Sequence, residues 1–192
     1  NGAGTPNAFS TIDIAKTGGS INFITNPLTV TTLSQTTTDA FTLTFEENLT
    51  VTDAVTFSTS GTLTFGDADT DVFTFTGGVT HTEGGPAYTR NTTLNGTLRT
   101  SDDVITLDNV ILGSDSIIRS LDAAGAAVTV NGTITGGGYN LALISGSETT
   151  TVSGNASNLG TVTLQNGTAS GAVSFDGNFE AETLTTYGGN HN

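Results

Sequence analysis

The chain has 192 residues, a net charge of −14 and only four cationic side chains, so it lacks the basic surface that nucleic acid or an anionic membrane requires. Cysteine is absent, which excludes a disulfide scaffold, a thiolate zinc site and a thiol nucleophile. No stretch approaches the roughly 18 apolar residues of a membrane-spanning helix, so we expect neither nucleic-acid binding nor membrane insertion.

Strand signals dominate the composition. Apolar residues make up 34% and charged residues 11% of the chain, whereas threonine and glycine are abundant. The apolar residues alternate with threonine in short runs, which is typical of strands rather than of disordered sequence. An acidic chain that is poor in lysine and free of cysteine, methionine and tryptophan suits the cell exterior. We therefore expect an all-β protein that is extracellular or on the cell surface.

Residues 1–59 form an irregular first part. Alternating runs occur at residues 41–45 (FTLTF) and 49–52 (LTVT), and each run places its large apolar residues on one face and its threonines on the other. The segment NPLT at residues 26–29 stands where the repeat described next would begin, but proline replaces glycine. Such departures are common in terminal repeats.

From residue 60 onward, a glycine-centred cassette recurs every 35 or 36 residues. It reads SGTL, NGTL, NGTI and NGTA, with its glycines at Gly61, Gly96, Gly132 and Gly167. One turn signal at a fixed period is typical of stacked, similar units. We therefore interpret residues 60–192 as the clearer repeats of a single domain, residues 1–192, that belongs to a longer or polymerising chain.

Further alternating runs continue through this repeated part. They occur at residues 63–65, 72–75, 105–107, 128–130, 141–143, 150–152, 162–164 and 173–175. Three runs fall between Val128 and Val162, where the next period begins. Three strands per period, separated by turn residues, predict a three-sided coil with apolar side chains inside. The sequence therefore predicts a parallel β-solenoid with about three strands per coil of about 35 residues.

The alternative fold is an antiparallel β-sandwich, which also uses many short alternating strands joined by turn-rich links. The fixed period favours the solenoid. The irregular segment at residues 77–90 favours the sandwich.

Two runs carry a family resemblance: VTVNGTI at residues 128–134 and GTVTL at residues 160–164. They resemble the repeats of bacterial filamentous-haemagglutinin-like and autotransporter-passenger β-strand-repeat surface proteins. The resemblance covers most of residues 60–186 and lies in composition, alternation and turn type. It implies a right-handed parallel β-helix that is exported and serves adhesion or builds an extracellular fibre.

The best candidate for a metal site is the segment GDADTD at residues 66–71. Asp67, Asp69 and Asp71 alternate, so their carboxylates can point to one side and offer oxygen ligands to calcium. The segment does not match an EF-hand, because Val72 takes the sixth position and Gly78 the twelfth. A solvated acidic turn is the simpler interpretation, and we expect no cofactor unless calcium binds weakly here.

Four further aspartates invite comparison with β-helix enzymes that cleave acidic polysaccharides: Asp102, Asp103, Asp108 and Asp115. Such hydrolases need a pair of carboxylates and cations that hold the substrate. Only two arginines lie near these residues in sequence. Capping of turns explains the aspartates better, so we expect no enzyme activity.

Neither histidine points to catalysis. His81 and His191 have no partner at the spacing of a metal site or a catalytic triad. The run around His81 predicts an outward or mid-strand position with an exposed side chain.

Outward pairs of the form Thr-X-Thr occur at residues 42/44, 50/52, 62/64 and 74/76. Flat, stacked arrays of such pairs can order water and bind ice. Their separations along the chain are irregular, so the sequence does not predict a regular grid.

Together these patterns predict a non-catalytic structural segment of an exported bacterial extracellular fibre or giant adhesin. Open coil ends expose unpaired backbone groups that template further β-structure, so we expect end-to-end self-association or tandem repeats. The alternative is an adhesin module that binds glycans or surfaces through irregular loops, with Tyr88 and Arg90 at its expected site in residues 77–90.

Overall fold

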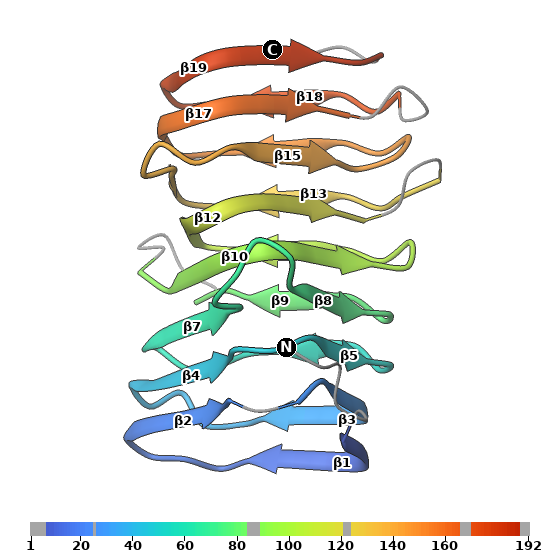
Figure 1. Cartoon of the computed structure of the whole chain (residues 1–192), viewed down its shortest axis with the longest axis vertical. Helices are drawn as coiled ribbons and strands as arrows, with labels where there is room; N and C mark the ends of the chain where they lie inside the picture. Colours follow the sequence, from blue (N-terminus) through green and yellow to red (C-terminus); the bar gives the residue numbers. More distant parts are fainter. Residues whose placement is uncertain (1–6, 25, 84–88, 121–123, 166–169, 189–192) are drawn as a thin grey trace.

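The computed structural model is a parallel β-solenoid, in which strands stack into about eight turns along one long axis (Figure 1). It describes residues 7–24, 26–83, 89–120, 124–165 and 170–188. Within these ranges there is no helix, and every strand pairing is parallel. The all-β solenoid is therefore confirmed, and the antiparallel β-sandwich is excluded. The described ranges also contain no helix with the length and hydropathy needed to cross a membrane.

Each coil has three faces. The first face is a separate six-stranded sheet, made of β6 (Val55–Thr56), β9 (Val79–His81), β11 (Ile105–Leu107), β13 (Val128–Val130), β16 (Thr150–Val152) and β18 (Val173–Phe175). The second and third faces belong to one 13-stranded sheet that turns the corner between them. Four long strands cross that corner: β10 (Asn91–Thr100), β12 (Asn109–Arg119), β17 (Ala156–Leu164) and β19 (Phe179–Thr186).

The remaining strands lie on one side of that corner or the other. The second face contains β2 (Gly19–Phe23), β4 (Phe41–Phe45), β7 (Thr62–Phe65) and β14 (Ile134–Thr135). The third face contains β5 (Leu49–Val51), β8 (Val72–Phe75), β15 (Leu141–Ile144) and the first parts of β1 (Asn7–Ile14) and β3 (Leu28–Gln35). The second parts of β1 and β3 continue onto the first face, where β3 contacts β6.

The coil is shorter than the sequence predicts. Successive coils lie about 22 residues apart, not about 35, although the prediction of three strands per coil is correct. The complete coil formed by β13, β14 and β15 shows the cause, because Thr150 already pairs with Val128 and opens the next coil. The two-residue strand β14 is too short to show alternation. The sequence pattern therefore misses β14 and assigns β16, which opens the next coil, to the same coil as β13 and β15.

The cassette glycines do not line one edge. Gly61 and Gly132 lie at the corner where the chain enters the second face, directly before β7 and near the start of β14. Gly96 lies in an irregularity within β10, with φ +89°, where the strand turns from the second face to the third. Gly167 lies outside the described residues. The 35-residue period is therefore not the period of the coil.

A different set of glycines does stack. A Cβ added to Gly154 would lie 2.4 Å from the carbonyl oxygen of Gly132, and one added to Gly177 would lie 2.5 Å from that of Gly154. These three positions are 22 or 23 residues apart, in agreement with the coil length. Close backbone approach at this corner requires glycine, because any side chain would overlap the coil below.

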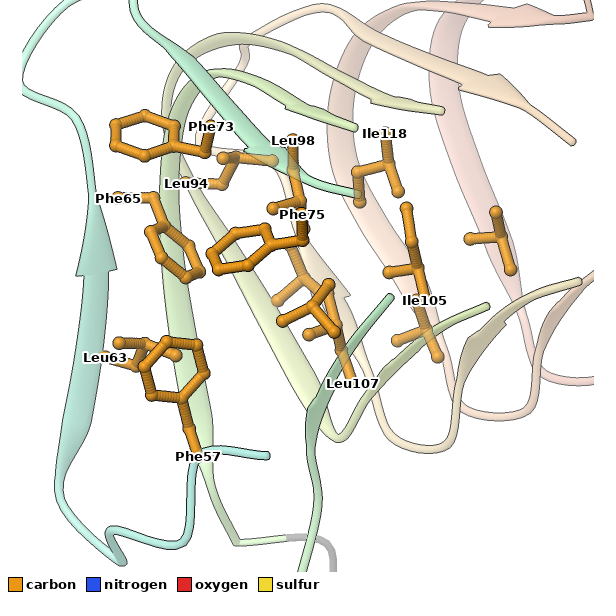
Figure 2. Packing of buried hydrophobic residues seen from close by; sticks show 14 of the residues in the cluster. Phe57, Leu63, Phe65, Phe73, Phe75, Leu94, Leu98, Ile105, Leu107 and Ile118 are labelled. Carbon is orange, nitrogen blue, oxygen red and sulfur yellow. The ribbon is translucent and has the colours of Figure 1, made fainter. Parts of the chain in front are cut away.

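The interior is one continuous apolar column. In the first half of the solenoid it contains six fully or almost fully buried phenylalanines: Phe41, Phe45, Phe57, Phe65, Phe73 and Phe75. Figure 2 shows several of these rings converging from different faces, and Phe57 meets Phe75 edge to face with ring centroids 6.0 Å apart. Valine, leucine and isoleucine fill the second half. Each such side chain contributes about 1.5–3 kcal/mol by burial.

Candidate functional site

The acidic loop between β7 and β8, residues 66–71, is closed by one of its own carboxylates. Oδ2 of Asp71 accepts hydrogen bonds from the backbone N–H groups of Asp67, at 3.1 Å, and Ala68, at 3.0 Å. Asp71 is therefore almost fully buried, whereas Asp67 and Asp69 are exposed. Within the described ranges, no three histidine or acidic side chains are grouped so that they could hold a metal ion. This geometry is that of the acidic turn and gives no support to the calcium site.

The acidic loop at residues 66–71 also borders a shallow hollow on the side of the solenoid. The loop rises from the level of β7 towards β10 (Figure 1), and Asp69 contributes to the wall of a hollow of about 440 Å³. The Asp115 carboxylate in this wall accepts hydrogen bonds from the backbone N–H and the side-chain amide of Asn140, at 2.9 and 2.7 Å. Oδ1 of Asn140 in turn accepts the N–H of Thr161 at 2.7 Å. These polar groups link successive coils and form no catalytic arrangement.

The four aspartates considered for polysaccharide cleavage are spread over the three corners of the coil. Asp102 and Asp103 follow β10, and Asp102 is an exposed turn residue with φ +79°. Asp108 follows β11 and is fully buried, where its Oδ2 accepts the N–H of Glu83 at 2.8 Å. Asp115 lies at the third corner, beside the hollow. The solenoid therefore does not bring these carboxylates together as an acid pair.

His81 is fully buried, and the expectation of an exposed side chain is wrong. In the run Val79-Thr80-His81, strict alternation places the first and third residues on the same face, so His81 points inward with Val79. Nδ1 lies 2.9 Å from the Thr92 hydroxyl, and Nε2 lies 3.2 Å from the carbonyl oxygen of Thr59. Because a carbonyl oxygen only accepts, Nε2 carries the proton and Nδ1 accepts from Thr92.

Burial sets the charge state of this histidine. The pKa of His81 is lowered from 6.5 to about 4, chiefly because burial removes the imidazole from water; the hydrogen bond to Thr59 opposes this shift, and the nearby positive charge of Arg90 adds to it. The imidazole is therefore neutral at physiological pH and acts as a hydrogen-bonded core residue. His191 lies outside the described residues.

Arg90 is also a structural residue. It is 7% exposed, and its Nη1 donates to the carbonyl oxygens of Phe57 at 3.2 Å and Thr82 at 2.5 Å. The guanidinium thus joins the corners of neighbouring coils and is not presented to a ligand. Tyr88, its proposed companion in glycan binding, lies outside the described residues.

A set of buried polar residues, which the sequence patterns do not predict, lies at the corner between the third and first faces. They are Thr100, Ser120, Ser145 and Gln165. Oγ of Ser120 donates to the carbonyl oxygen of Ala126 at 2.6 Å and accepts its N–H at 2.9 Å, which closes the corner loop. Their position in the sequence could have predicted these buried polar residues. A polar residue follows shortly after the last inward aliphatic residue of each third-face strand, at the place where the chain leaves that face.

The two ends of the solenoid leave core positions uncovered. Phe9 in β1 is in register with Val30 in β3, yet Phe9 is 51% exposed and Val30 is fully buried. Leu184 in β19 is in register with Val162 in β17, with 49% and 0% exposure. At each end an inward-facing apolar side chain therefore meets solvent.

No protein-family model, curated protein or solved structure matches this chain.

Proposed function

We propose that this chain is a non-catalytic structural segment of an exported bacterial extracellular fibre or giant adhesin, and that it self-associates end to end. The observation that carries the proposal is the exposure of Phe9 and Leu184 at positions that are fully buried one coil further in. An added coil at each end would bury these side chains as Val30 and Val162 are buried.

The first end offers an apolar hollow. It has a volume of about 450 Å³, and its apolar lining comes from Phe9, Ile12, Phe23, Ile24 and Leu28. Within the described ranges, β1 pairs only with β3, so its other edge presents unpaired N–H and C=O groups. An edge of this kind accepts a further parallel strand.

The last end is open in the same way. Within the described part of the chain, β19 pairs only with β17. Leu184 and Tyr187 are about half exposed beside it. The rings of Phe175 and Phe179 lie 4.5 Å apart next to this surface. A coil laid on this end would cover a strand edge and a group of apolar side chains together.

The two ends differ, and contact between them would be head to tail. A heterologous contact that does not close into a ring produces an open filament. Since every pairing in the described part of the chain is parallel, contact between the last coil of one copy and the first coil of another would continue the same arrangement. The acidic, lysine-poor composition supports an extracellular place for such a filament.

The test is the oligomeric state of the purified chain, measured by light scattering and by electron microscopy. We expect filaments whose mean length grows with protein concentration. The double variant Phe9→Lys/Leu184→Lys introduces charge at both ends and should remain monomeric. The matched control is Ile111→Lys, which changes an aliphatic residue that is 37% exposed in the middle of the solenoid and should still form filaments. A monomeric parent chain at all concentrations would overturn the proposal.

The alternative function, a glycan- or surface-binding adhesin module, finds less support. Arg90 is buried and engaged by backbone carbonyl groups, so it is not available to a glycan. The hollow beside Asp69 has no aromatic residue in its lining on which a sugar ring could stack.

A further inference from the structure

The outward side chains of the second face form two columns that run across seven successive coils. The first column contains Ser20, Thr42, Thr62, Asn91, Asn109, Thr133 and Asn155. The second, two residues further along each strand, contains Asn22, Thr44, Thr64, Thr93, Ile111, Thr135 and Ser157, which are register partners throughout. We call these two columns the hydroxyl face.

Unequal coil lengths hide this grid in the sequence. Register partners in the second column are 18 residues apart between Thr93 and Ile111 but 29 apart between Thr64 and Thr93. The extra residues lie in the connections between strands and leave the strand registers intact. Pairs 42/44 and 62/64 therefore lie on neighbouring coils of one face, whereas Thr50 and Thr74 are register partners on the third face.

The hydroxyl face carries no charge. The chain has a net charge of −14, yet none of the residues in the two columns is ionisable. The acidic residues lie mainly at corners, as Glu46 and Glu47 do after β4, and Glu180 in β19 follows the last coil of the face. A partner that complements this face is therefore itself uncharged, in contrast to one attracted to the rest of the surface.

Six of the seven threonine hydroxyls of this face are directed to solvent, whereas Thr133 Oγ1 lies 3.2 Å from Oδ1 of Asn109 in the same column. Within the described residues, no hydrogen bond to a protein group is made by the side chains of Thr42, Thr44, Thr62, Thr64, Thr93 or Thr135. A β-branched side chain on a strand has few χ1 rotamers, so each hydroxyl and methyl group keeps a defined direction. The face therefore presents ordered donors and acceptors to solvent.

The spacing of these groups repeats in two directions. Residues two apart on a strand are separated by about 6.6 Å, and neighbouring coils by about 4.8 Å. Both repeats are close to oxygen repeats on the prism planes of hexagonal ice. Figure 1 shows the strands of successive coils stacked one above another along the solenoid axis.

We propose that the hydroxyl face binds the surface of ice crystals. Ice is an uncharged lattice of donors and acceptors, and its water molecules can complete the hydrogen bonds of the rigid threonine hydroxyls. An insoluble polysaccharide fits less well, because neither column contains an aromatic residue for stacking against sugar rings. A second copy of the face would bury many hydroxyls without fixed partners, which is costly.

The test compares two lysine substitutions of outward threonines. Thr64→Lys lies at the centre of the hydroxyl face. The control, Thr129→Lys, lies between Thr106 and Thr151 in the single outward column of the first face. Both threonines are half-buried and sit on short strands, so the substitutions have similar structural cost. Circular dichroism melting curves establish that both variants are folded.

The readouts are thermal hysteresis and partition of the purified chain into a growing ice shell. We expect the parent chain and Thr129→Lys to give both signals and Thr64→Lys to lose both. Three results would overturn the proposal: no signal from the parent chain, equal loss in both variants, or retention only by insoluble polysaccharide. The hydroxyl face lies on the side of the solenoid and not at its ends. A negative result for ice binding would therefore leave end-to-end association, which is measured by filament length, unaffected.

Discussion

His81 is the register partner of Leu107, so an imidazole occupies an inward position that holds an aliphatic side chain in the next coil. Val130 and Val152 continue the same column. The ring packs edge to face against Phe57, with centroids 6.5 Å apart. A titratable group therefore sits inside a hydrophobic column, with Thr59 and Thr92 as its hydrogen-bond partners.

This position predicts a pH dependence of stability. The pKa of His81 is lowered from 6.5 to about 4 in the folded chain, so between these values the unfolded chain binds a proton that the folded chain does not. The free energy of unfolding should fall as the pH decreases through this window, by up to about 3 kcal/mol, and this contribution should level off below pH 4.

The measurement is urea unfolding at a series of pH values between 4 and 7. The variant His81→Leu fits the aliphatic column but leaves Thr59 and Thr92 without their partner. It should be less stable at neutral pH and should lack the histidine part of the pH dependence. If the parent and the variant show the same slope over this range, His81 is not the group responsible.

His81 also shows which structural features the sequence patterns predict and which they do not. Alternation located most strands correctly, because apolar residues at every second position need a shared interior. The same alternation, applied strictly to residues 79–81, would have placed His81 inside with Val79. The sequence does not show the two threonine oxygens, from Thr59 and Thr92, that satisfy the ring nitrogens and allow a polar side chain at this inward position.

The stack of Gly132, Gly154 and Gly177 predicts a strong effect of a single methyl group. In Gly154→Ala, the added Cβ would lie 2.4 Å from the Gly132 carbonyl oxygen and 2.6 Å from its carbon. Both atoms belong to the backbone of the neighbouring coil, so relief requires the coils to move apart. We expect a loss of about 1–3 kcal/mol in unfolding free energy.

The matched control is Gly18→Ala. No atom lies within 4 Å of a Cβ at Gly18, and its φ is not in the left-handed region. Its unfolding free energy should stay within about 0.5 kcal/mol of the parent value. Equal melting temperatures for Gly154→Ala and Gly18→Ala would contradict the close contact at this corner.

Buried serine at the opposite corner predicts a second stability effect. In Ser120→Ala, the N–H and the carbonyl oxygen of Ala126 both lose the hydroxyl that now pairs with them. These backbone groups are partly buried, and leaving them without partners costs up to about 1–3 kcal/mol. The comparison variant is Ser174→Ala, whose hydroxyl makes an exposed hydrogen bond to Asp176 and should change stability by about 0.5 kcal/mol or less. Chemical denaturation of both variants measures the difference.

The coil length and the hydroxyl face cannot be predicted from the sequence, because the connections between strands vary in length. A repeat is visible when equal spacing accompanies equal structure, but here the connections between strands vary while the registers do not. Thr64 and Thr93 are neighbours in space across 29 residues, and Ile134–Thr135 forms a strand too short to alternate. The glycine-centred cassette recurs at a regular spacing that is not the coil period. Asparagine and glycine suit many different turns, so the same residues occur at different places in the coil.

Calcium should not stabilise the chain through the acidic loop. The Asp71 carboxylate is already occupied by the N–H groups of Asp67 and Ala68, and the carbonyl oxygen of Asp71 accepts the N–H of Thr97 at 2.8 Å. We therefore expect the melting temperature to be the same in the presence of EDTA and of millimolar calcium. Asp71→Asn weakens the closure of the loop and should lower the melting temperature in both conditions, whereas Asp67→Asn should not. A calcium-dependent rise in the parent chain that is lost in Asp69→Asn would instead establish a metal site at this loop.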